Sequence, residues 1–187
     1  GLGIPAEPLF RSRSDLDFGV YPYTTSSNVL ASYAPIGAGM PGVEIDRIIG
    51  VVKSYSTCVG KGPFVCELSG EEAEKMRQTC GETEKMHHRI GPFDLAATRY
   101  GVKVQAATEI ALTKLDVLIE FDTIKVCVAY ECDGVRYDYF PQQQSVLFHA
   151  KPVYEELPGW KGVDISGCTS YDELPENARK YVEHLEE

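Results

Sequence analysis

"ALTKLD", residues 111–116, is an apolar run that ends abruptly in polar side chains. The run is rich in strand-forming residues, so we expect a strand over residues 108–112 that passes into a polar turn. The Asp116 carboxylate can accept two hydrogen bonds from the N1–H and exocyclic amine of guanine, while the stem of Lys114 lies along the base. Thr113, Lys114 and Asp116 are therefore candidate guanine-binding residues, although most Lys-x-Asp pairs are solvated loop residues.

The apolar pattern around this stretch predicts more strands. They are expected over residues 108–112, 124–130, 135–140 and 151–155. The first two are nearly all apolar, which is typical of strands covered on both faces. Asp133-Gly134 is a typical hairpin turn between the second and the third.

Helical patterns occupy other parts of the chain. Ile45, Ile48, Ile49 and Val52 recur at helical spacing and predict a helix over residues 43–56. A capping-box pattern predicts a helix over 70–79, Asp94 can cap a third, and Leu174-Pro175 opens a last one. We therefore expect one α/β domain over residues 1–187, with a mostly parallel sheet flanked by helices and a short antiparallel hairpin.

Composition narrows the function classes. Hydrophobic residues make up 43% of the 187 residues, and the net charge is −10. This charge argues against a general nucleic-acid or anionic-membrane surface, which needs a basic stripe. Six cysteines lie without C-x-x-C spacing and no signal-peptide pattern occurs, so we expect reduced thiols and a cytoplasmic location.

Several segments together resemble the adenylosuccinate synthetase family, ligases of purine (AMP) biosynthesis that join L-aspartate to IMP with GTP. The matching segments are DLDFGVYPYTTSSN (15–28), YAPIGAGM (33–40), GVVKSYSTCVGKGPFVCEL (50–68), RIGPFDLAATRYGVKVQAATEIALTKLD (89–116), 124–130, PVYEELPGWK (152–161) and 167–185. They follow the family's order over most of residues 15–187. Residues 1–14 match nothing in the family, and their origin stays open.

The resemblance implies roles for individual residues. Thr113, Lys114 and Asp116 match its guanine-binding motif. Thr25 matches a threonine on the IMP phosphate, and Ser26 follows it in the same turn; without the resemblance, an ordinary Ser/Thr turn is equally good. Val59 and Gly60 match a turn beside the IMP and aspartate sites. GTP, IMP, L-aspartate and Mg²⁺ are the implied ligands, and a homodimer or a complementary chain is the implied assembly.

The sequence also departs from the family. The family's N-terminal Gly-Asp-Glu-Gly-Lys-Gly-Lys loop, which holds the GTP phosphates and Mg²⁺, does not occur in this sequence, and Phe10 stands where the family has a glutamine on IMP. The arginine-rich aspartate loop reads Thr83–Arg89, TEKMHHR, so His88 and Arg89 are a remnant of it. The sequence stops before the family's terminal strand and the Gly-rich loop that completes the guanine pocket.

These departures leave three hypotheses. The chain is the central-to-C-terminal part of a GTP-dependent synthetase, as a fragment or split gene. Alternatively, it is a diverged, catalytically inactive paralogue that binds a guanine nucleotide or a partner protein. In the third hypothesis it is a structural protein in which Lys114 and Asp116 are idle. In each case we expect no catalytic residue and no Mg²⁺ ligand here, and no ligase activity from this chain alone. We also expect the apolar edges of an incomplete sheet to be covered by a partner chain.

Overall fold

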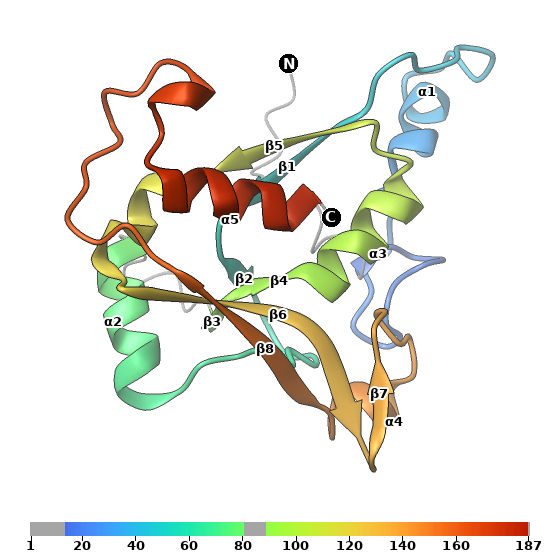
Figure 1. Cartoon of the computed structure of the whole chain (residues 1–187). Helices are drawn as coiled ribbons and strands as arrows, with labels where there is room; N and C mark the ends of the chain where they lie inside the picture. Colours follow the sequence, from blue (N-terminus) through green and yellow to red (C-terminus); the bar gives the residue numbers. More distant parts are fainter. Residues whose placement is uncertain (1–13, 81–88, 187) are drawn as a thin grey trace.

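The computed structural model describes residues 14–80 and 89–186, in which helices and strands alternate (Figure 1). The strands are β1 (Ile49–Lys53), β2 (Ser56–Cys58), β3 (Arg89–Gly91), β4 (Phe93–Asp94), β5 (Glu109–Thr113), β6 (Thr123–Cys132), β7 (Val135–Tyr137) and β8 (Lys151–Pro158). The α-helices are α1 (Ala34–Gly37), α2 (Gly70–Cys80), α3 (Leu95–Gln105), α4 (Gln144–Leu147) and α5 (Glu176–Glu186). The 3-10 helices are η2 (Ala31–Tyr33), η4 (Leu115–Glu120) and η5 (Tyr171–Glu173).

The strand β1 pairs in parallel with β5, so that Val52 lies opposite Leu112. The helix expected over residues 43–56 is therefore wrong. The apolar residues that suggested helical spacing also serve a strand, because adjacent apolar residues place side chains on both faces. Val52 is buried in the core, whereas Ile49 remains 52% exposed on the opposite face.

The longest strand, β6, organises a second sheet. It pairs in parallel with β4 and antiparallel with β7 and β8. The hairpin at Asp133-Gly134 is confirmed, with both residues in the left-handed region at φ 51° and 76°. The α/β class is thus confirmed, with parallel pairs and an antiparallel part that extends beyond the predicted hairpin to β8 and to the β2–β3 pair.

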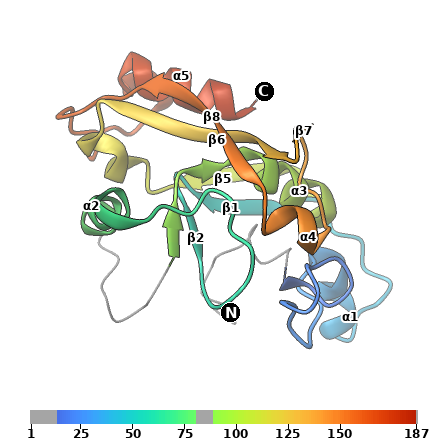
Figure 2. The same cartoon turned by 90° about the horizontal axis from the view of Figure 1, so that it is seen from below.

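Three of the helices that cover these strands lie where the sequence predicts them. The predicted helix over 70–79 is α2, and the predicted last helix is α5. Asp94 caps α3 as expected, since its side chain accepts a hydrogen bond from the Ala97 N–H at 3.0 Å. Figures 1 and 2 show α5 against the space between the β1–β5 pair and the β6–β8 ribbon.

The core follows β6. Its residues Ile124, Val126, Ala129 and Tyr130 are almost fully buried, which confirms a strand covered on both faces. The same expectation is wrong for β5, because Ile110 is 43% exposed. All six cysteines are free thiols. In the two described stretches, no helix combines the length and apolar character that crossing a bilayer needs.

Candidate nucleotide-binding site

The turn after β5 presents the predicted guanine-binding side chains to solvent. Thr113 ends the strand, Lys114 turns the backbone with φ 62° and ψ 28°, and η4 begins at Leu115. Lys114 and Asp116 are both exposed, one on each side of the half-buried Leu115. The left-handed conformation of Lys114 is uncommon for a residue with a side chain, so the neighbouring structure must hold it.

Ser54 provides that support from beneath the turn. Its backbone N–H donates to the Thr113 carbonyl at 2.8 Å, and its hydroxyl donates to the Lys114 carbonyl at 2.6 Å. The Tyr181 hydroxyl in turn donates to the Ser54 carbonyl at 3.0 Å. The backbone of the turn is therefore fixed by other residues, and the side chains of Lys114 and Asp116 stay available.

A hollow of about 480 Å³ opens beside Asp116. Its wall includes the 165–171 segment, which contributes the hydroxyl groups of Ser166, Thr169 and Ser170. The segment is fixed at Thr169, whose backbone N–H donates to the Glu173 carboxylate at 2.6 Å. The Asp116 carboxylate gives this hollow an acceptor, whereas the Thr169 hydroxyl is already engaged with the Glu173 carboxylate oxygens at 3.3 and 3.4 Å.

Sequence reasoning missed Ser54, Tyr181 and the 165–171 segment. Ser54 and Tyr181 each lie 60 or more residues from the turn in the sequence, and the 165–171 segment lies about 50 residues from it. None of them carries a motif of its own. A serine two residues after the run of residues 48–52 is the only local signal for Ser54. Nothing in the sequence indicates that residues 165–171 lie next to Asp116.

The predicted phosphate-binding turn holds Thr25 and Ser26 at the surface. The Thr25 hydroxyl lies 3.1 Å from the Ser14 carbonyl and 3.0 Å from the Ser27 carbonyl, so its proton is already engaged within the turn. Its oxygen also accepts from the Ser27 N–H at 3.4 Å. Among the described residues, the Ser26 hydroxyl has no hydrogen-bond partner, so it is the freer of the two hydroxyls.

Asp15 anchors this turn from inside. Its carboxylate is fully buried and accepts from the backbone N–H groups of Asp17, Phe18 and Val29 at 2.9, 3.1 and 2.6 Å. Burial raises the pKa of Asp15, but the backbone hydrogen bonds outweigh it and hold that pKa below its usual value. The ionised carboxylate thus holds the backbone of the loop through these hydrogen bonds.

Val59 and Gly60 form an exposed turn after β2, and Gly60 has φ +79°. Arg89 holds this turn, since its guanidinium donates to the carbonyls of Gly62 at 2.6 Å and Gly60 at 3.3 Å. It also pairs with both oxygens of Glu67, which raises the pKa of Arg89. The fork of Arg89 is therefore occupied within the chain. His88 and Phe10 lie outside the described residues.

The structure brings two of the predicted groups together. A Cβ added to Gly62 would lie 3.2 Å from the Tyr23 ring, so the Val59–Gly62 turn packs against the segment that carries Thr25. The Lys114–Asp116 turn lies at the other end of residues 54–58, which lead from β1 into β2. The predicted guanine and IMP residues thus flank one short connection.

A family model for adenylosuccinate synthetase matches residues 12–187. The chain belongs to the adenylosuccinate synthetase family. The resemblance seen in the sequence is therefore confirmed.

Curated relatives show how much of the family's length is present. The adenylosuccinate synthetases of Parafrankia sp. (strain EAN1pec) and Trichlorobacter lovleyi are each 49% identical to this chain over 176 residues. Each match covers 92% of this chain and 41% of the relative, so the chain spans about two fifths of their length. A solved structure, fully ligated adenylosuccinate synthetase from Plasmodium falciparum, is 36% identical with a TM-score of 0.83, covering 94% of this chain and 43% of that one.

The adenylosuccinate synthetase family implies Mg²⁺ as a ligand. Across residues 14–80 and 89–186, no three His, Cys, Asp or Glu side chains converge on a point where a metal ion could be held. The described surroundings of Asp116 therefore do not fit a metal ion held by three such side chains. No chemical step through Mg²⁺ is assigned to residues of this chain.

Proposed function

We propose that this chain supplies the guanine-recognition element, and part of the IMP site, for the GTP-dependent ligation of L-aspartate to IMP. Membership in the adenylosuccinate synthetase family supports the proposal at the level of reaction class. The finer assignment depends on the residues described above.

The observation that carries the proposal is the braced turn at Lys114. Both side chains of the motif are exposed, while their backbone is held by Ser54. The Asp116 carboxylate next to the hollow can accept the two donors of guanine, whereas adenine lacks that donor pair. The stem of Lys114 covers the face of the base, so the pair selects guanine over adenine.

The IMP side depends on the turn at Thr25 and on the Val59–Gly60 turn. A phosphate requires several donors in a concave arrangement, and the exposed backbone around Ser26 and Gly60 can supply N–H groups. Gly60 allows a ligand to approach its backbone closely because it has no side chain. Arg89 contributes here by shaping the turn rather than by a free guanidinium.

The phosphoryl-transfer step needs positioned Mg²⁺ and a phosphate loop, and neither is assigned to this chain. The proposal therefore places the chemistry on residues supplied by another part of the enzyme, with a second copy or a complementary chain as the partner. Exposed apolar side chains on β1 and β5, such as Ile49 and Ile110, suit a covering partner.

Isothermal titration of the chain with GTP, GDP, ATP and IMP tests the proposal. We expect guanine nucleotides to bind, ATP to bind at least about 10-fold more weakly, and Asp116→Asn to weaken GTP by about 10-fold or more, as for loss of a charged hydrogen-bond pair. Asp138→Asn is the matched control, an exposed aspartate on the distant hairpin whose loss should change nothing. Equal binding of GTP and ATP, or equal affinity of the Asp116 variant and wild type, would contradict the proposal.

A further inference from the structure

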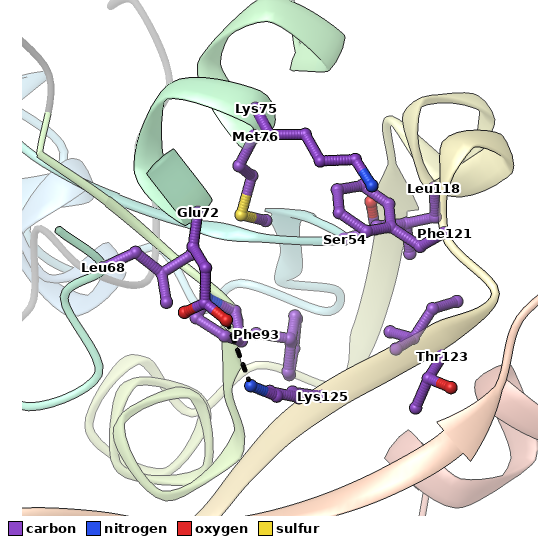
Figure 3. A pocket seen from close by; sticks show the side chains of 12 residues that line it. Ser54, Leu68, Glu72, Lys75, Met76, Phe93, Leu118, Phe121, Thr123 and Lys125 are labelled. Atoms are coloured by element: carbon purple, nitrogen blue, oxygen red, sulfur yellow. Dashed lines mark ion pairs between the residues drawn. The ribbon is translucent and has the colours of Figure 1, made fainter. Parts of the chain in front are cut away.

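A second cavity, of about 220 Å³, lies between α2 and β6 and has Ser54 in its lining (Figure 3). Its floor is apolar, and four of the side chains that form it are at most 5% exposed. The apolar lining consists of Leu68, Met76, Phe93, Leu118, Phe121 and Ile124. Neither Lys114 nor Asp116 lines it, so this cavity is separate from the hollow beside Asp116.

The size of the cavity limits its occupant. An apolar cavity of about 150 Å³ holds one benzene ring, so this one has room for a single ring with a short substituent. Phe93 and Phe121 offer ring faces and edges, and Met76 offers a thioether, all of which favour an aromatic partner. A fused or larger ligand would not fit without displacing these side chains.

The charges at the mouth indicate the substituent. Lys125 lies 3.5 Å from a carboxylate oxygen of Glu72, and the Lys75 ammonium lies 5.2 Å from the centre of the Phe121 ring (Figure 3). Figure 3 shows the Lys75 ammonium beside Phe121, away from the Glu72–Lys125 pair, so the lining carries one more ammonium group than carboxylates, in a chain whose net charge is −10. Lys75 forms no ion pair with another described residue, so its ammonium group can pair with an anionic group on a ligand.

We infer that this cavity binds a small monocyclic aromatic carboxylate, with its ring on the apolar floor and its carboxylate at Lys75. The inference goes beyond the proposed nucleotide role and does not depend on it. The two sites nevertheless share Ser54, which lines the cavity and donates to the Lys114 carbonyl.

The test uses 3-(4-fluorophenyl)propanoate as the probe and ¹⁹F NMR to follow its titration into the chain. The neutral probe is 3-(4-fluorophenyl)propan-1-ol, which has the same ring and no charge. We expect saturable binding of the acid with a dissociation constant of about 1 mM, and weaker binding of the alcohol. Backbone amide shifts of Ser54, Met76 and Leu118 should report the location.

Two surface variants then separate this cavity from other apolar surface. Lys75→Gln should weaken the acid about threefold, as for an exposed ion pair, and leave the alcohol unchanged. Lys103→Gln is the matched control, because Lys103 is an exposed lysine that lines a different apolar groove, between α3 and β5. Both variants change exposed side chains, so the fold is retained, which amide spectra will check.

Three outcomes would overturn the inference. They are the absence of saturation up to about 20 mM probe, equal affinity for the acid and the alcohol, and weakening by Lys103→Gln but not by Lys75→Gln. Because GTP binding is measured separately, failure here leaves the proposed nucleotide role intact, and failure of that role leaves this site intact.

Discussion

The two halves of the candidate site hold their loops in opposite ways. At the Lys114–Asp116 turn, the backbone is held by Ser54, and the motif side chains project freely. At the other half, Thr25 and Arg89 are themselves used to hold their loops, through the Ser14, Ser27, Gly60 and Gly62 carbonyls. A residue matched to a family's ligand contact is therefore available to a ligand only where another residue supports the backbone.

The largest effect should come from removing the buried anchor of the Thr25 segment. Asp15→Ala leaves three backbone N–H groups without their acceptor, at roughly 1–3 kcal/mol each, so we expect a loss of about 3 kcal/mol in the free energy of unfolding. Urea denaturation measures it. Asp17→Ala is the control, because that exposed carboxylate accepts, among the described residues, only from the side chains of Asn28 and Tyr33 at the surface, and its loss should cost far less. Equal losses in the two variants would break the comparison between the halves.

A smaller loss is expected at the next support, Arg89. Arg89→Met removes a partly buried bidentate pair with Glu67 and two carbonyl contacts, and should lower the free energy of unfolding by about 2 kcal/mol. Arg47→Met is matched to it, since Arg47 also forms a bidentate pair, with Glu109, but at the surface. The Arg47 variant should unfold at nearly the wild-type urea concentration. A larger effect at Arg47 would show that Arg89 does not hold its turn.

Ser54→Ala sharpens the comparison from the other side. The variant loses one hydrogen bond, worth about 1 kcal/mol of stability. Without that hydrogen bond, the backbone of the Lys114–Asp116 turn is less firmly held. We expect GTP affinity to fall several-fold in calorimetric titration, because the Ser54 hydroxyl holds the Lys114 carbonyl. Ser145→Ala, at an exposed serine in α4, should leave affinity unchanged. Unaltered GTP affinity in Ser54→Ala would mean that the turn holds itself.

The smallest effect is a pH dependence. The pKa of Asp15 is lowered in the folded chain, so its ionised form stabilises the fold above the unfolded pKa of about 3.9. That contribution is lost as the pH falls below about 4 and through the lowered folded value. Asp15→Asn should therefore show a flatter dependence of unfolding free energy on pH in this window than wild type. Parallel curves would indicate that Asp15 does not titrate with folding.

Much of the fold could be predicted from the sequence because its signals are local. The Asp133-Gly134 hairpin, the Asp94 cap and the apolar run of β6 each depend on neighbouring residues. The β1 strand could not be predicted from the sequence, because a short apolar run fits a helix or a strand equally well. Its pairing with β5, 60 residues away, decides between them.

The candidate site divides in the same way. The residues proposed to contact guanine carry a motif, so Lys114 and Asp116 could be proposed from the sequence, and both are exposed in the structure. The residues that position them have no motif, and Ser54 and the 165–171 segment became visible only in three dimensions. The occupied state of Arg89 also depends on Glu67 and on two carbonyl groups, which no spacing rule specifies.

The hydrogen bond from Tyr181 to Ser54 has a consequence for how the protein is made. The tyrosine that holds Ser54 belongs to α5, whereas Asp116 is synthesised 65 residues earlier. At about 5–20 residues per second of translation, the Lys114–Asp116 turn leaves the ribosome seconds before Tyr181, the residue that holds Ser54. A nascent chain therefore carries the Lys114–Asp116 turn before the Tyr181 hydrogen bond to Ser54 can form, and the support of the turn is complete only after α5 has emerged and docked.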